Sequence, residues 1–469
     1  MLSGKLSYSS YFEVELRDDK VGRVIHHMYQ AETIRWFKGW LNYEREIKMH
    51  LNKELQRILD GKEGIIKQEA LRSLIKYGDA MGAEDFIPIT SAHTSFLAID
   101  VVALAFPPRK RELSQEDIFN FTKEMEKTKV KVKTTINPGI IDRNNWEKIG
   151  ATKEISDSVR KTGIIARKCG IISNFSCVPY INGNIPLFKD HCSWSETSAV
   201  LYINSILGAR TNRDSYEISL YSALVGHTPK FGLHLDENRK GTDIIDVQCE
   251  LESRSDWGAL GYFIGDKVGV GIPVLKNLNR PETEDLVQFC GSMSSQGSTG
   301  MFFIPGLSPE APDLDSALGG NTPKNIYIFG KKEKDDTYKY LSNKKSGKVD
   351  FVFLGCPHKT LYEIAKIADL LEGKKISPDT RLWIMTSSSF RREAEDLGYA
   401  EVIEKSGGEL LSDGCLGLYY VNSPLNRPKM KFIATDGAKQ AFVIQKSFNS
   451  KVLYSNTKQC IEIALKGGI

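Results

Sequence analysis

The sequence predicts an α/β protein whose last third forms a mostly parallel, doubly wound sheet. From residue 349 onward, short apolar runs alternate with stretches of helical periodicity. Such alternation is typical of parallel strands that are joined by crossover helices. The length of 469 residues also exceeds what one simple hydrophobic core accommodates, so we expect two or three domains.

The first third is expected to be mainly helical, with two strands. Apolar residues recur at helical spacing from Ile34 to Ile58, and Ser114 with Asp117 forms the pattern of a capping box. Residues 130–136 alternate in polarity and end in a turn of Asn, Pro and Gly, which indicates a strand. The expected elements are helices up to about residue 60 and at 65–81, 114–128 and 156–168, and strands at 86–90 and 130–136.

The middle third is expected to hold strands that Gly-rich loops separate, followed by the alternating pattern. Residues 333–349 are rich in Lys, Asp and Ser, which predicts a surface connection. The expected strands are 243–251, 299–304, 325–330, 349–354, 381–385, 431–434 and 451–454, and the expected helices are 359–372, 389–406 and a last one that ends at Lys466.

Composition excludes several classes of function. The net charge of +4 is spread along the chain without a dense basic tract, so we expect no nucleic-acid partner. We expect no membrane partner, because no apolar run is long enough to cross a bilayer. The eight cysteines are scattered, no CxxC occurs, and the first thirty residues lack the apolar core of a signal peptide. These features predict reduced thiols and a cytoplasmic location.

The segment from Trp194 to Arg213 carries the strongest indication of a binding site. It combines an indole, a carboxylate, several hydroxyls, two amides and two guanidiniums within twenty residues. A solvated helix face would carry Lys and Glu, whereas this segment carries short hydrogen-bonding groups and Arg, which suit a polar or anionic small molecule. The alternative is a core helix that ends at Gly208 and is followed by cationic residues.

Three cysteines lie next to Gly, Pro or polar turn residues. Cys356 follows a predicted buried strand, Cys415 follows a helix and a short extended piece, and Cys177 lies in a loop with Pro179. Ligands of open α/β folds bind at loops beyond the carboxyl ends of strands. If the three thiolates converge, they could hold zinc or an iron–sulfur cluster with one open iron, and spacing alone does not separate these two. The alternative is three small buried thiols.

Further candidate residues lie in turns after predicted strands. His93 in Thr90-Ser91-Ala92-His93 is a candidate acid, base or substrate donor, with a capping histidine as the alternative. Thr135 and Asn137 follow a strand in the same way. His234 lies in a loop with two carboxylates and an Arg, which is a candidate site; the alternative is a solvated loop. Lys439 could bind an anion, and the alternative is that its segment begins a helix.

Together these motifs resemble the large, catalytic part of aconitase X, a divergent branch of the aconitase superfamily. The resemblance runs in order from about residue 53 to the C-terminus. The segments that carry it are Ile87–His93, Lys133–Pro138, Ser176–Tyr180, Trp194–Arg213, Gly232–Arg239, Gly306–Ala311, Gly355–His358, Asp413–Cys415 and Thr435–Lys439.

The resemblance implies a hydro-lyase with a multi-lobed α/β/α fold and an iron–sulfur cluster on Cys177, Cys356 and Cys415. Family members dehydrate mevalonate 5-phosphate to anhydromevalonate 5-phosphate, or cis-3-hydroxy-L-proline. The Trp194 segment is closer to the mevalonate 5-phosphate branch. In that branch a small swivelling domain is a separate subunit, and because we see no such domain in this sequence, we expect a heterodimer.

The resemblance and the turn residues together give a set of assignments. Three parts are expected: a helical extension at 1–52, catalytic lobes at 53–332 and a Rossmann-like lobe at 333–469 that carries Cys356 and Cys415. The candidate catalytic residues are His93, Ser91 and Thr135, and the candidate substrate-binding residues are Thr90, Asn137, Ser195, Glu196, Ser198, Asn204, Arg210, Arg213, His234 and Lys439.

Two alternatives of other classes remain open. A non-catalytic binding or scaffold protein is one, because Phe303 stands where the resemblance predicts His and Ser308 stands in place of Thr. A zinc hydrolase is the other, although no compact motif such as HExxH is present.

Overall fold

The computed structural model describes residues 49–95, 123–417, 430–447 and 450–469. The described residues belong to one compact unit, Glu46–Ile469. Most of the predicted extension at 1–52 and most of the predicted helix at 114–128 lie outside the described residues. The predicted α/β class is confirmed, since helices alternate with sheets that are mostly parallel.

The first part of the unit packs helices against two small sheets. Asn52 caps α2 by accepting a hydrogen bond from the Leu55 N–H, and α3 buries an apolar face that includes Leu71 and Leu74. The antiparallel pair β1–β5 and the parallel sheet β3-β2-β4 follow. The elements are α2 Lys53–Leu59, α3 Ile65–Met81, β1 Phe86–Pro88, β2 Ser91–Thr94, β3 Lys133–Ile136, α6 Lys153–Lys168, β4 Cys192–Trp194, α7 Thr197–Tyr202, α8 Tyr216–Val225 and β5 His227–Pro229.

The β3-β2-β4 sheet sets the position of several candidate residues. His93 on the central strand β2 lies opposite Thr135 of β3 and Trp194 of β4. Because all three strands are parallel, the residues that follow them emerge at the same edge. Asn137 and Ser195 are therefore brought next to the histidine.

The middle part contains a second parallel sheet of order β7-β6-β8. The predicted strand at 299–304 is wrong, since only Phe303 forms an isolated bridge, to Val274. The predicted surface connection at 333–349 is also wrong at its start, because residues up to Tyr340 belong to helix α12. Ion pairs between Lys and Asp four residues apart stabilise this helix. The elements are β6 Asp243–Val247, α9 Arg254–Val268, β7 Pro273–Lys276, α10 Thr283–Gln296, α11 Leu314–Leu318, β8 Ile326–Phe329 and α12 Lys331–Tyr340.

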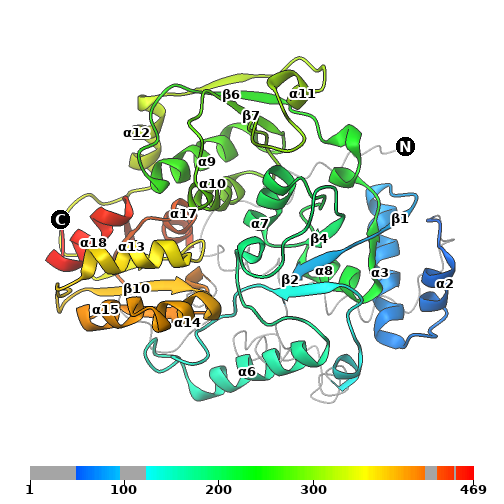
Figure 1. Cartoon of the computed structure of the whole chain (residues 1–469), viewed down its shortest axis with the longest axis horizontal. Coiled ribbons are helices and arrows are strands. Elements are labelled where there is room, and N and C mark those ends of the chain that lie inside the picture. Colours follow the sequence, from blue (N-terminus) through cyan, green and yellow to red (C-terminus); the bar gives the residue numbers. More distant parts are fainter. Residues whose placement is uncertain (1–48, 96–122, 418–429, 448–449) are drawn as a thin grey trace. The chain divides into compact units, whose positions relative to one another are not determined.

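The last part, coloured yellow to red in Figure 1, is the predicted doubly wound sheet. Its five strands are all parallel, in the order β11-β10-β9-β12-β13. The predicted helix at 389–406 is interrupted at Gly398, whose φ of 82° ends one helix before the next begins. The elements are β9 Phe351–Leu354, α13 Leu361–Leu371, β10 Arg381–Thr386, α14 Ser388–Asp396, α15 Tyr399–Ser406, β11 Glu409–Ser412, β12 Phe432–Thr435, α17 Ala438–Ser447, β13 Lys451–Tyr454 and α18 Thr457–Lys466.

The two faces of this sheet belong to different hydrophobic clusters. Alternate strand residues such as Val352 and Ile384 pack with α13, α15 and α18, whereas Phe353 and Trp383 pack with α17 and the helices of the middle part. The chain runs outward from β9 to β11 and then returns to β12 on the other side of β9. The carboxyl ends of β9 and β12 therefore flank a topological switch point, where open α/β sheets bind ligands.

Candidate active site

Three cysteines lie at loops close to the switch point and keep part of their surface accessible. Cys356 follows β9 beside the carboxyl end of β12, Cys415 follows β11, and Cys177 precedes the helical turn Pro179–Ile181. These three are partly exposed, as is Cys249. The buried cysteines are Cys169, Cys192, Cys290 and Cys460.

Close backbone contacts hold the Cys356 loop. A Cβ added at Gly437, just after β12, would lie 2.5 Å from the Cys356 carbonyl oxygen. A Cβ at Gly355 would lie 2.5 Å from the Met385 carbonyl oxygen. Neither separation is sterically allowed, so glycine is required at both positions to bring the thiol to the strand ends.

The three thiols have the Lys439 ammonium as a common neighbour. The backbone N–H of His358 donates a hydrogen bond to Cys177 Sγ at 3.3 Å, which joins the Cys177 and Cys356 segments. Burial raises the pKa of Cys356 to about 12, against the opposing effect of the Lys439 ammonium and with a further contribution from Cys415. Burial also raises the pKa of Cys177, to which Glu196 and Cys356 contribute. Metal binding would therefore have to release protons from these thiols.

A chain of hydrogen bonds runs from the β3-β2-β4 sheet to Glu196. Asn184 Nδ2 donates to Thr135 Oγ1 at 2.9 Å, and Thr135 Oγ1 lies 2.9 Å from His93 Nδ1. His93 Nε2 lies 3.0 Å from Asn137 Oδ1, and Asn137 Nδ2 donates to Glu196 at 2.9 Å. The Asn137 oxygen can only accept, so Nε2 of His93 carries the proton and Nδ1 accepts from Thr135.

Burial keeps the His93 ring neutral. The ring is fully buried, and burial lowers its pKa to about 4, although Asn137 and Glu196 act in the opposite direction. Ser195 Oγ donates to the His93 carbonyl oxygen at 2.9 Å. Thr135 and Asn137 engage the two ring nitrogens of His93. This geometry favours a role for His93 in positioning Asn137 and not in exchanging protons with a substrate.

Glu196 and Lys439 form the charged centre of the site. Burial alone would raise the pKa of Glu196, but Lys439, Asn137 and Ser198 overcome this effect and lower the pKa to about 2. The Lys439 ammonium lies 3.4 Å from Glu196 Oε1, and Ser198 Oγ donates to the same oxygen at 3.0 Å. Burial lowers the pKa of nearby Arg213 to about 10, so this guanidinium also stays cationic at neutral pH.

Three other predicted substrate-binding residues, Asn204, Arg210 and His234, lie in a second group together with Arg239 and Glu310. We call this group the Arg210 cluster. Arg210 pairs with Asp236 and lies 3.5 Å from Glu310, while Arg239 binds the other Glu310 oxygen at 2.8 Å. Asn204 donates to the Thr211 and Gly300 carbonyls. The two guanidiniums are thus already paired with carboxylates, which favours a structural use of this cluster.

Thr90 and Ser91 lie at the start of β2. Thr90 is exposed, and its Oγ1 lies 3.4 Å from the His191 carbonyl oxygen. Ser91 Oγ donates to Cys192 Sγ at 3.4 Å and accepts from the Trp194 indole at 3.2 Å. These contacts fix β4 against β2 and do not reach Glu196.

Sequence reasoning missed three residues of the site: Asn184, Tyr216 and His358. Asn184 lies in an Asn-Gly-Asn turn, and Tyr216 accepts from Asn137 Nδ2 at 2.9 Å. His358 lies two residues after Cys356 and is not among the predicted site residues. Their partners lie tens to hundreds of residues away in the sequence, so local patterns did not reveal them.

Comparisons with known proteins agree over most of the chain. Family models match three successive segments: the aconitase X first domain at residues 48–237, the second domain at 241–339 and the third domain at 349–466. The chain belongs to the aconitase X family.

The relatives of this aconitase X chain include two differently named dehydratases. The phosphomevalonate dehydratase large subunit of Methanocaldococcus jannaschii is 34% identical over 426 residues and covers 89% of this chain and 100% of that protein. The cis-3-hydroxy-L-proline dehydratase of Pseudomonas aeruginosa is 28% identical and covers 88% of this chain and 69% of that protein. The crystal structure of Thermococcus kodakaraensis aconitase X, in its holo-form, is similar at a TM-score of 0.75 and 33% identity, covering 89% of this chain and 100% of that chain.

Phe303, which stands where the family resemblance predicts His, lies in the core of the middle part. It is 2% exposed, and it packs in an apolar cluster with Val274 and Met301. Its backbone pairs with Pro273 and Leu275 of β7. Phe303 therefore contributes to the packing of this aconitase X chain around β7.

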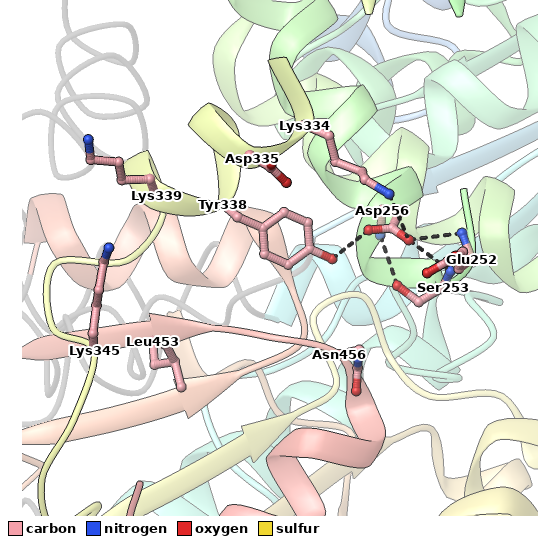
Figure 2. A pocket seen from close by; sticks show the side chains of 10 residues that line it. All are labelled: Glu252, Ser253, Asp256, Lys334, Asp335, Tyr338, Lys339, Lys345, Leu453 and Asn456. Atoms are coloured by element: carbon pink, nitrogen blue, oxygen red, sulfur yellow. Dashed lines mark hydrogen bonds and ion pairs between the residues drawn. The ribbon is translucent and has the colours of Figure 1, made fainter. Parts of the chain in front are cut away.

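A cavity of about 740 Å³ lies between α12, the start of α9 and the end of β13 (Figure 2). Figure 2 shows the Tyr338 hydroxyl directed at Asp256, which it contacts at 2.9 Å. The Asp256 carboxylate also accepts from the backbone N–H groups of Glu252 and Ser253. Because Asp256 is used to cap α9, and none of the candidate site residues line the cavity, we assign no function to it.

Proposed function

We propose that this chain is the large subunit of a dehydratase that removes water from phosphomevalonate, with an iron–sulfur cluster held by Cys177, Cys356 and Cys415. The observation that carries the proposal is the shared environment of three thiols from separate segments, which all have Lys439 as a neighbour, while Cys177 and Cys356 also have Glu196. The names of the relatives supply the reaction and the substrate.

The residues present suit such a cluster. The Lys439 ammonium faces all three thiols, and together with Glu196 they raise its pKa despite burial. A cation at this position would offset the negative charge that three thiolates bring to a cluster. In addition, the Tyr180 hydroxyl, close to Cys177 and Glu196, is buried and has no hydrogen-bond partner among the described residues.

A single zinc ion suits the same residues less well. Zinc needs its protein ligands at about 2.0–2.3 Å around one point. Within the described ranges, no three His, Cys, Asp or Glu side chains are grouped closely enough to hold one metal ion. A cluster presents a different iron to each thiolate, and so it tolerates wider spacing between the cysteines.

The substrate would be held by charge. Lys439 lies 3.4 Å from Glu196, and Arg213 has the same carboxylate as a charged neighbour. These two cations would bind the carboxylate or phosphate groups of the substrate. Glu196 stays ionised and keeps the Lys439 ammonium in place. Arg210 takes no part in this proposal, because Asp236 and Glu310 already pair with it.

Elimination of water needs help for the departing hydroxyl group and a base for the carbon-bound proton. When bound, the cluster would supply a Lewis acid for the hydroxyl group. Thr135 and Asn184 orient His93, which in turn holds Asn137 against Glu196. We assign proton abstraction to neither His93 nor Glu196, because both are fully engaged by neighbouring groups.

We further propose a small subunit as the partner, since several relatives are named as large subunits. We expect the assembly to work in the cytoplasm, where the thiols stay reduced. Among the described residues, no helix is both long and apolar enough to cross a membrane.

The proposal is tested by an assay of purified protein. The full chain is loaded anaerobically with iron and sulfide, mixed with the small subunit and given phosphomevalonate or, in parallel, cis-3-hydroxy-L-proline. We expect mass spectrometry to show loss of one water from phosphomevalonate, abolished by Cys356→Ser and retained in the control Cys249→Ser. If only cis-3-hydroxy-L-proline is dehydrated, the proposed substrate is wrong and hydroxyproline takes its place. If the loaded assembly dehydrates neither compound, the result favours a non-catalytic scaffold.

A further inference from the structure

His358 contacts the segments of all three candidate cluster cysteines. It lies two residues after Cys356 and is 2% exposed. Its backbone N–H donates to Cys177 Sγ at 3.3 Å. Its side chain reaches the third segment, since Nε2 lies 2.8 Å from the Gly414 carbonyl oxygen, next to Cys415.

The hydrogen bond to Gly414 fixes the state of the imidazole ring. A carbonyl oxygen only accepts, so Nε2 carries the proton and Nδ1 presents its lone pair. Nδ1 is buried and has no hydrogen-bond partner among the described residues. The bond made by Nε2 is therefore the contact through which this side chain is oriented.

The segment that receives this bond is itself rigidly placed. The Cys415 N–H donates to the Gly139 carbonyl oxygen at 3.0 Å, and the Gly139 N–H donates to the Asp413 carbonyl oxygen at 2.7 Å. A Cβ added at Gly414 would lie 3.1 Å from the backbone nitrogen of Asp142. With the backbone on one side and His358 on the other, the Cys415 loop has little freedom to move away from Cys356.

We propose that His358 is a positioning residue for the cluster, which ties the Cys177, Cys356 and Cys415 segments together through one backbone and one side-chain hydrogen bond. This inference rests on the cluster of the proposed function. It goes further by giving a role to a side chain that is not a ligand, whose loss leaves all three thiols present. Partners outside the ligand set change metal affinity by about 10- to 100-fold when they are removed.

The test compares His358→Leu, which fills the space without a donor, with His358→Gln, whose amide can still reach Gly414. His227→Ala is the control for loss of a buried histidine elsewhere, since His227 lies in β5 and is 8% exposed. The full chain is reconstituted with iron and sulfide, and the rate of iron loss to a chelator and the reduction potential are measured. Should His358→Leu fail to fold, His358→Asn, one methylene too short to reach Gly414, replaces it.

We expect iron loss at least about 10-fold faster in His358→Leu, with a shifted reduction potential, because a misplaced Cys415 no longer holds its iron. His358→Gln should stay within threefold of the wild type, and His227→Ala should be unchanged. Iron loss within twofold of the wild type in His358→Leu, with the same potential, would overturn the inference and leave the proposed function intact.

A second readout separates this inference from the cluster itself. In protein without iron, we expect iodoacetamide to alkylate Cys415 at least about 10-fold faster in His358→Leu than in the wild type or in His358→Gln. Wild-type protein that takes up no iron or sulfide would contradict the cluster of the proposed function. Unchanged alkylation of Cys415 in His358→Leu would contradict the positioning role.

Discussion

The ion pair between Glu196 and Lys439 gives the most quantitative prediction for the site. The two charged groups lie 3.4 Å apart, with side chains 10% and 29% exposed. At an effective dielectric constant of about 20, their attraction is about 5 kcal/mol. Solvent screening at the partly exposed lysine reduces it to about 2–3 kcal/mol.

The pKa of Glu196 supports the same magnitude. It falls from 4.5 to about 2 although burial acts in the opposite direction, so Lys439, Asn137 and Ser198 together leave a net stabilisation of about 3 kcal/mol. Because the folded-state pKa lies below the ordinary value, this stabilisation is complete at neutral pH and is lost as the pH falls from 4.5 toward 2.

The assay is a double-mutant cycle of Lys439→Met and Glu196→Gln, followed by urea unfolding of the full chain. We expect a coupling energy of about 2–3 kcal/mol at pH 7.5, which decreases by roughly 40% at pH 3.5. The control cycle uses Lys405 and Glu401, whose side chains are 73% and 66% exposed, and it should show far weaker coupling. A Glu196 coupling as small as that of the control, or one independent of pH, would refute the reasoning.

Three further predictions concern activity and stability. Asn137→Ala should lower kcat/KM by about 10- to 100-fold, because it removes a hydrogen bond to a charged carboxylate worth about 1.5–3 kcal/mol; a change below threefold in the dehydration assay would contradict this. Burial raises the pKa of Asp214 to about 6, so this carboxyl contributes stability that is lost as the pH rises from about 4 to 6. Asp214→Asn removes that contribution, so its urea midpoint should rise relative to the wild type between pH 4 and 6, and a difference that does not change with pH would count against it. Lys359→Met removes the cation that two buried carboxylates share, and leaves Glu363 with Arg254 at 3.5 Å. It should cost about 3–5 kcal/mol of unfolding free energy, whereas Lys332→Met on the surface should leave the melting temperature nearly unchanged; equal effects would contradict the account.

The sequence predicts the part of the site that depends on local order. Cys356 follows an apolar strand and precedes Pro357, and strand–helix alternation places such a loop at the carboxyl edge of a parallel sheet. His93, Thr135 and Asn137 are each predicted to follow a strand, but His93 and Thr135 lie within β2 and β3, where His93 contacts both Thr135 and Asn137.

Long-range pairing limits what the sequence predicts. Arg210 lies in the most informative segment, yet its partner Glu310 lies one hundred residues further along the chain. Charge in itself does not say whether an Arg faces a ligand or a carboxylate of the same chain. Likewise, the polar residues of α12 suggest a connection until their ion pairs four residues apart are seen.

The content of iron, zinc and acid-labile sulfide, measured together with an absorption spectrum on anaerobically purified protein, tests the central claim most directly. We expect iron and sulfide in similar amounts, lost in Cys177→Ser, Cys356→Ser and Cys415→Ser, while Cys249→Ser keeps both. Folded, anaerobic protein that binds zinc alone, or that keeps its iron and sulfide in all three variants, would contradict the assignment of these cysteines.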